Sequence, residues 1–139
     1  MESMKKKMKA FYVICICMCL LGACSFGQSK TDKLRDLDFT VVSDDRLPEE
    51  LKTILEEKKQ SEFKITFQDG EYLYICMGYG QQQTGGYSIT VKELYLTENA
   101  IYVDTDLMGP SAAEKITETS SYPYIVLKTE YLDKTVVFQ

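Results

Sequence analysis

Between two β-type runs, the chain contains the stretch Gln81-Gln82-Gln83-Thr84-Gly85-Gly86-Tyr87-Ser88-Ile89. A dense apolar run, Tyr72 to Tyr79, precedes it, and an alternating run, Tyr87 to Val91, follows it. Adjacent glycines between such runs permit backbone angles that residues with a Cβ avoid. We therefore expect Gly85-Gly86 to form the tip of a hairpin that presents itself to another molecule. The alternative is that the two glycines form only a turn.

Period-two alternation on both sides of this stretch indicates further strands. It places Phe63, Ile65 and Phe67 on one face of a strand that turns at Asp69-Gly70 into the Tyr72–Tyr79 run. That run is apolar on both faces, so we expect it to lie centrally in a sheet. Further strands are predicted near residues 38–43, 87–91, 101–107, 125–128 and 135–138.

One helix is predicted, from Pro48 to Lys59. Proline suits its first turn, and Leu47, Leu51, Ile54 and Leu55 form an apolar stripe that should pack on a sheet. The predicted fold class is mainly β (α+β): an antiparallel β-sandwich or curled sheet of about seven strands with one packed helix.

The N-terminal residues have the pattern of an export signal. Lysines at positions 5–7 and 9 precede an apolar stretch, Ala10 to Leu21, which is shorter than the ~20 residues of a spanning helix. The stretch ends in Leu21-Gly22-Ala23-Cys24, which resembles a bacterial lipobox. This resemblance implies cleavage before Cys24, lipidation of that cysteine and anchoring at the extracytoplasmic face of the cell membrane. An ordinary signal peptide or a short anchor is the alternative.

These patterns divide the chain into three parts. Residues 1–23 are expected to be a lipoprotein signal peptide, residues 24–37 a flexible tether, and residues 38–139 a single β-rich domain. Of the five cysteines, Cys15, Cys17 and Cys19 would leave with the signal peptide and Cys24 would be acylated. Only Cys76 remains, and its apolar surroundings predict a small buried hydrophobe.

Charge and composition exclude several functions. The first 23 residues hold four Lys and one Glu, so the net charge of −5 for the whole chain becomes −8 for the remaining 116 residues. Nucleic acid binding needs a basic face, so we expect none. The chain has no His, which removes the Ser-His and Cys-His nucleophile systems and argues against an enzyme. Asp104 and Asp106 are too few for calcium, and no metal or cofactor is expected.

Three motifs, taken together, resemble a known family. They are Thr84-Gly85-Gly86-Tyr87-Ser88-Ile89, Gly109-Pro110 and Tyr122-Pro123-Tyr124, in that order and joined by strands. They resemble the C-terminal domain of the PrcB-like protease-complex lipoproteins, over about Tyr72 to Lys128. The resemblance implies a lipoprotein that associates with an exported protease and stabilises it.

A second resemblance is to the chagasin-type inhibitors of papain-like cysteine proteases. Those inhibitors present an N-P-T-T-G-aromatic loop beside an aromatic-Pro loop, and the chain offers Thr84–Tyr87 and Tyr122–Tyr124 as analogous loops. It departs from that pattern at Gln82-Gln83, where the family has Asn-Pro, and it lacks the R-P-W element.

The candidate partner-binding residues are Thr84, Gly85, Gly86, Tyr87, Tyr122, Pro123 and Tyr124. Tyrosine supplies contact area at a small cost in side-chain entropy, and glycine lets a partner approach the backbone. With Tyr79, the three tyrosines could form an aromatic patch around the Gly-Gly loop, and core packing is the alternative for each of them. The sequence thus favours a membrane-anchored lipoprotein that binds an exported protease through the Thr84–Tyr87 loop and stabilises or restrains it. The alternatives are an envelope lipoprotein that binds a peptide or a glycan, and a chagasin-like inhibitor of cysteine proteases.

Overall fold

The computed structural model describes residues 32–112, 115–116 and 118–139. The chain divides into two units, Met1–Asp32 and Lys33–Gln139, and the fold described below is that of the second. The expected signal peptide, the lipidation site Cys24 and the first part of the expected tether lie outside the described residues.

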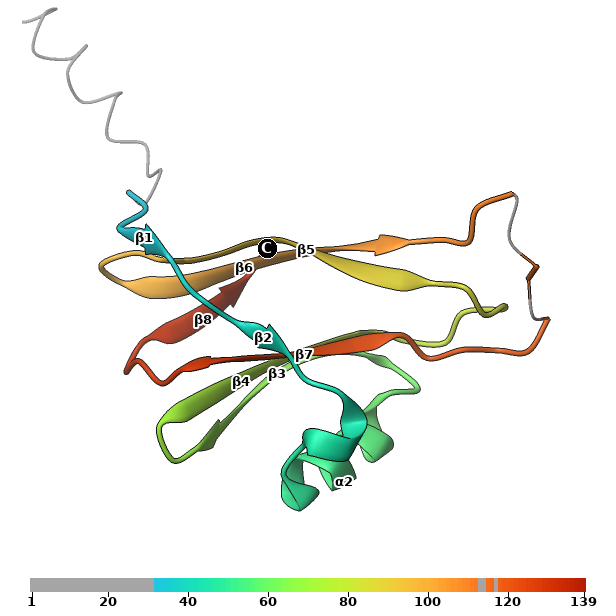
Figure 1. The fold of residues 1–139 in the computed structure, drawn as a ribbon, viewed down its shortest axis with the longest axis horizontal. Coiled ribbons are helices and arrows are strands. Elements are labelled where there is room, and N and C mark those ends of the chain that lie inside the picture. The colour runs from blue at the N-terminus through green and yellow to red at the C-terminus, as the bar shows by residue number, and fades with distance from the viewer. Residues whose placement is uncertain (1–31, 113–114, 117) are drawn as a thin grey trace, which may run out of the picture. The chain divides into compact units, whose positions relative to one another are not determined.

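The second unit is a β-sandwich of two four-stranded sheets with one helix on it (Figure 1). One sheet has the order β1-β5-β6-β8 and the other the order β2-β7-β4-β3; every pair is antiparallel except β6 with β8. The predicted fold class is confirmed. The described residues form eight strands, two of them only two residues long, where the sequence indicated about seven. The strands are β1 (Arg35–Asp36), β2 (Thr40–Val41), β3 (Glu62–Asp69), β4 (Tyr72–Tyr79), β5 (Ser88–Leu96), β6 (Ala100–Met108), β7 (Tyr124–Glu130) and β8 (Thr135–Phe138).

The helix α2 (Glu49–Lys58) follows a single 3₁₀ turn, η2 (Asp44–Arg46), and lies within the predicted range. Pro48 precedes its first turn, where proline loses no helical hydrogen bond. Leu51 and Leu55 are fully buried against the sheet that contains β4. No helix in the described part of the chain is long and apolar enough to span a membrane.

Strand β4 lies between two hydrophobic clusters, which explains why its sequence is apolar on both faces. Leu73, Ile75 and Met77 join the cluster between the two sheets, and Tyr74 and Cys76 join the cluster under α2. Cys76 is fully buried, as predicted, and burial raises the pKa of its thiol to about 12. β4 pairs with β3 on one side and with β7 on the other, so its central position is also confirmed.

The folded unit includes residues that the composition placed in the tether. The Leu34 amide donates to the Leu96 carbonyl (2.8 Å), and Arg35–Asp36 pairs with β5. Leu37 is buried in the cluster between the sheets. These residues belong to the fold because they pair through the backbone, and a polar composition does not reveal such pairing.

The connection from β4 to β5 is not a hairpin, which corrects the prediction for Gly85-Gly86. β4 already has β3 and β7 as neighbours, so neither of its edges is free for β5. The chain instead crosses from one sheet to the other and enters β5 beside β6 (Figure 1). The Gly-Gly segment is therefore part of a crossover at one end of the sandwich.

Candidate functional site

Two crossover segments meet at the end of the sandwich where Gly85-Gly86 lies. One joins β4 to β5, and the other joins β6 to β7 (Figure 1). The Gln82 amide donates to the Ser121 carbonyl (2.8 Å) and the Ser121 amide donates to the Gln82 carbonyl (3.1 Å). The Tyr79 amide also donates to the Pro123 carbonyl (3.0 Å). Segments almost 40 residues apart thus form one surface, which we call the loop end: residues 81–87 and 120–123.

Side-chain hydrogen bonds reinforce this pairing. The Ser121 hydroxyl donates to the Thr84 carbonyl oxygen at 2.6 Å. The Gln81 amide nitrogen donates to the Ser120 hydroxyl oxygen at 3.1 Å, and the Gln82 amide nitrogen to the Tyr79 carbonyl oxygen at 3.2 Å. Because each segment holds the other, the backbone of the Gly-Gly stretch is positioned before any partner arrives.

The two glycines of the pair have different roles. Gly86 has a φ of 84°, a conformation that side chains with a Cβ rarely adopt, whereas Gly85 has no positive φ. The chain enters the loop end through Gly80, which has a φ of 74° and lies close to the backbone of Glu62. The local conformation therefore requires glycine at position 86 and not at position 85.

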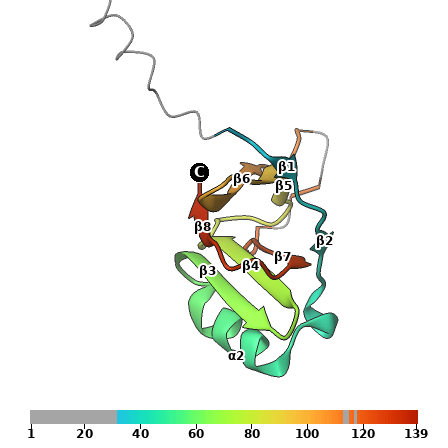
Figure 2. The ribbon, with the colours of Figure 1, turned by 90° about the vertical axis from the view of Figure 1, so that its left-hand side faces the viewer.

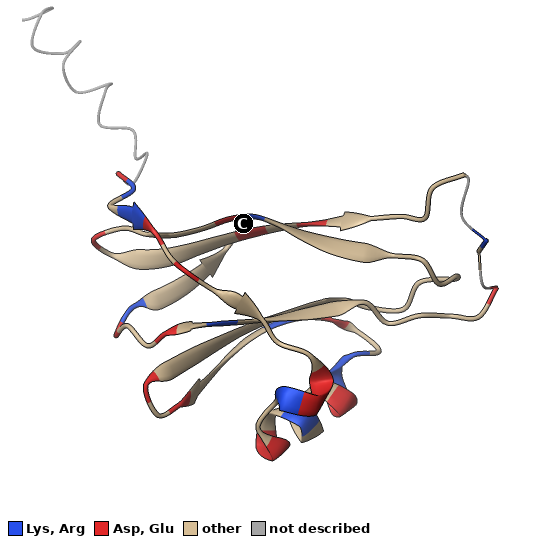
Figure 3. Cartoon of the chain, viewed as in Figure 1, with Lys and Arg blue, Asp and Glu red and all other residues tan. Residues whose placement is uncertain are grey.

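Six of the seven candidate residues belong to the two segments that form the loop end. Thr84, Gly85, Tyr87, Tyr122 and Pro123 are partly exposed, and Gly86 is exposed. The Tyr87 ring lies beside Gly109, where a Cβ would be 3.5 Å from Cε1 of the ring. No charged residue occurs from Tyr79 to Val91, and this connection is tan throughout in Figure 3. Depletion of charge around aromatic residues is typical of the centre of a protein–protein interface.

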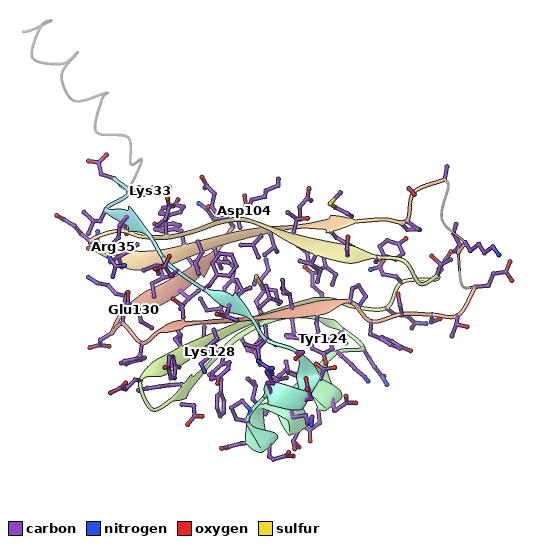
Figure 4. The ribbon with its side chains drawn as sticks, in the orientation of Figure 1. Lys33, Arg35, Asp104, Tyr124, Lys128 and Glu130 are labelled. Carbon is purple, nitrogen blue, oxygen red and sulfur yellow. The ribbon has the colours of Figure 1, made fainter. Side chains whose placement is uncertain are left out.

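The seventh candidate, Tyr124, turns away from the loop end. It is the first residue of β7, and it lies on the same face as Val126, toward α2. Its hydroxyl donates to an Asp44 carboxylate oxygen at 2.6 Å, and its ring lies 6.4 Å from that of Phe63. Figure 4 shows Tyr124 on the α2 side of its sheet. Burial, followed by this hydrogen bond, raises the pKa of the Tyr124 hydroxyl.

Tyr79 also lies apart from the other tyrosines. Its hydroxyl is 2.7 Å from the Thr105 hydroxyl of β6, so its side chain bridges the two sheets. The aromatic patch of four tyrosines is therefore not formed, because strand alternation sends Tyr79 and Tyr124 to opposite faces of their sheet. Tyr87 and Tyr122 are the two that the loop end retains.

The described residues contain no group of three or more Asp, Glu, Cys or His side chains that could hold a metal ion. Asp106, one of the two aspartates weighed for calcium, is 3.9 Å from the Lys92 ammonium group. Asp106 therefore lies on a solvated face of β6.

Two hollows on the surface were not predicted from the sequence. One, of about 450 Å³, lies beside β2, where the Lys128 ammonium group is 4.0 Å from the centre of the Tyr72 ring. The other, of about 400 Å³, lies between β3 and the segment around β8. In the sequence, Lys64, Thr66 and Gln68 alternate with apolar residues, and this pattern could have indicated the second hollow. The same alternation is typical of an ordinary solvated strand face.

A family model described as PrcB C-terminal matches residues 73–130. The matched segment begins at the second residue of β4 and ends with β7, so it contains the whole loop end. It coincides with the region on which the sequence motifs placed the resemblance. The match suggests the role of a protease-complex subunit. No curated protein and no solved structure matches the chain.

Proposed function

We propose that this chain, which belongs to the PrcB-like family, is a membrane-anchored lipoprotein that binds an exported protease through its loop end. The bound protease would be stabilised or restrained. One observation supports the proposal: the two crossover segments of the matched region are hydrogen bonded to each other, and one of these bonds joins Thr84 to Ser121, the residue before Tyr122 and Pro123.

The chemistry of the loop end suits a protein partner. Tyr87 and Tyr122 each supply a large contact area and one hydroxyl group for a hydrogen bond. Pro123 stiffens the segment that carries Tyr122, and Gly85-Gly86 lets a partner backbone approach closely. Because the surface is already ordered by its own hydrogen bonds, binding would cost little conformational entropy.

Anchoring is proposed from the lipobox-like motif that ends at Cys24. Replacement of Cys24 by Ala should abolish labelling of the protein by a fatty-acid analogue and leave the unprocessed precursor. Stable anchoring would need more than one acyl chain on this cysteine, because one chain binds a bilayer only weakly. Equal labelling of both proteins would refute this part of the proposal.

The partner is tested by affinity purification of the tagged full-length protein from detergent-solubilised cells. We expect the wild-type protein to recover a protease, and Tyr87→Ala and Tyr122→Ala to recover much less of it at unchanged thermal stability. Tyr72→Ala is the matched control, because Tyr72 is exposed (47%) and lies at the opposite end of β4. Recovery of an envelope peptide or a glycan without a protease would support the other function instead. Activity of the recovered protease, assayed with and without the chain, separates stabilisation from inhibition.

A further inference from the structure

The four edge strands of the sandwich differ greatly in length. β1 and β2 have two residues each and β8 has four, whereas β3 has eight. Folded proteins usually keep free edges short, because unpaired backbone groups attract other strands. In the described part of the chain β3 has β4 as its only neighbour in the sheet, and Figure 2 shows it at the outside of the sandwich, on the same side as β8.

The hydrogen-bond pattern shows which backbone groups of β3 are free. In β4, the Tyr79 amide and the Glu71 carbonyl just before the strand both bond toward β7, to Pro123 and Tyr131. Backbone direction alternates along an antiparallel ladder, so the even-numbered residues of β4 bond toward β3. Their partners there are the odd-numbered residues 63, 65, 67 and 69. The N–H and C=O groups of Lys64, Thr66 and Gln68 therefore face the free edge.

The same three residues also line the cleft of about 400 Å³ beside β3. Phe63, Ile65 and Phe67 pack on the cluster under α2, so the side chains of Lys64, Thr66 and Gln68 lie on the opposite face of the strand. The other wall of the cleft includes the apolar residues Leu132, Val136 and Phe138, which pack partly on the cluster between the sheets.

The charge of the cleft is opposite to that of the protein. The chain carries a net charge of −5, yet the charged side chains that line the cleft among the described residues are Lys64 and Lys134, both cationic. The Lys134 ammonium group donates to the Glu98 carbonyl oxygen, and Lys64 has no ion pair within the described residues. A carboxylate beside β3 would thus meet a cation that has no carboxylate partner.

We propose that β3 binds an extended, acidic segment of a partner protein by strand addition. The segment would pair with the free backbone groups of Lys64, Thr66 and Gln68, place a carboxylate side chain at Lys64, and place apolar side chains against Leu132, Val136 and Phe138. This surface is separate from the loop end, so the proposal does not depend on the identity of the partner bound there. The competing account is that Lys64 is an inward charge that only prevents edge pairing.

The test measures fluorescence anisotropy of labelled octapeptides mixed with the full-length protein in detergent micelles. The first probe has valine, glutamate and valine at successive alternate positions, so that all three share the face toward the cleft, and threonine elsewhere. A second probe has lysine in place of glutamate, and a third is the first with methylated amide nitrogens on its pairing edge. We expect binding of the first probe only. Thr66→Pro should weaken it at least about tenfold, because proline removes an N–H that faces the free edge, whereas Thr66→Ala should stay close to wild type.

Charge reversal provides a readout that folding defects do not reproduce. Lys64→Glu should weaken binding of the glutamate probe about tenfold and create binding of the lysine probe. The proposal is overturned if the wild-type protein binds no probe, if the methylated probe binds equally well, or if Lys64→Glu leaves the preference unchanged. Sedimentation that shows a dimer lost in Thr66→Pro would overturn it too, because a second copy would then occupy the edge.

Discussion

The loop end and the free edge of β3 differ in whether their backbone groups are already hydrogen bonded. At the loop end, two crossover segments satisfy each other through the Gln82–Ser121 pair and the Ser121 hydroxyl, and side chains remain for a partner. Along β3, the amides and carbonyls of Lys64, Thr66 and Gln68 have no neighbouring strand in the described part of the chain. The first surface is therefore suited to side-chain recognition and the second to recognition through the main chain.

The largest effect is expected from proline on the two sides of β3. The Phe67 amide bonds toward β4, so Phe67→Pro should lower the free energy of unfolding by about 3 kcal/mol or more through the lost hydrogen bond and lost packing. Thr66→Pro should lower it by less than about 1 kcal/mol, because proline is tolerated where the N–H faces away from the ladder. Urea unfolding measures both. Equal losses for the two variants would show that the edge is not free.

A smaller effect is expected from the two glycines of the loop end. Gly86→Val should lower the free energy of unfolding by about 2 kcal/mol, because Gly86 has a φ of 84° that valine can adopt only under strain. Gly85→Ala should cost much less, since Gly85 has no positive φ. Thermal unfolding of both variants checks this, and a reversed order would mean that position 85 is the strained one.

The smallest effect concerns the hydrogen bond that joins the two crossover segments. Ser121→Ala removes the donor to the Thr84 carbonyl and should lower the free energy of unfolding by about 1 kcal/mol. Ser120→Ala, which affects only an exposed side-chain contact with Gln81, should stay within about 0.5 kcal/mol of wild type. If both variants unfold like the wild type, the segments do not depend on this bond for their pairing.

The sequence predicted the elements of the fold better than their connections. Strand-like apolar patterns and the apolar stripe of the helix located β2 to β8 and α2, because those patterns report burial on one or both faces. The sequence around Gly85-Gly86 indicated a change of direction, but it could not show that both edges of β4 were taken by β3 and β7. β1 was missed because Arg35 and Asp36 are polar and pair only through the backbone.

The candidate site was predicted in the same partial way. The structure brings Thr84 into contact with Ser121, the residue before Tyr122, although 37 residues separate them in the sequence. The face of the sheet on which Tyr124 lies depends on the register of β7. That register is set by pairing with β4, and the sequence does not reveal it. The free edge of β3 had no local signal, because a strand that lacks a neighbour has the same alternation as one that has it.

We propose that the loop end binds the protease. The most direct test is to measure the affinity of purified variants for the protease that affinity purification recovers. We predict that Tyr87→Ala weakens binding about thirtyfold, which corresponds to ~2 kcal/mol for an aromatic anchor. Tyr72→Ala and Thr66→Pro should bind the protease with nearly wild-type affinity. Wild-type affinity for Tyr87→Ala, together with loss of binding in Thr66→Pro, would contradict the account and move the protease site to β3.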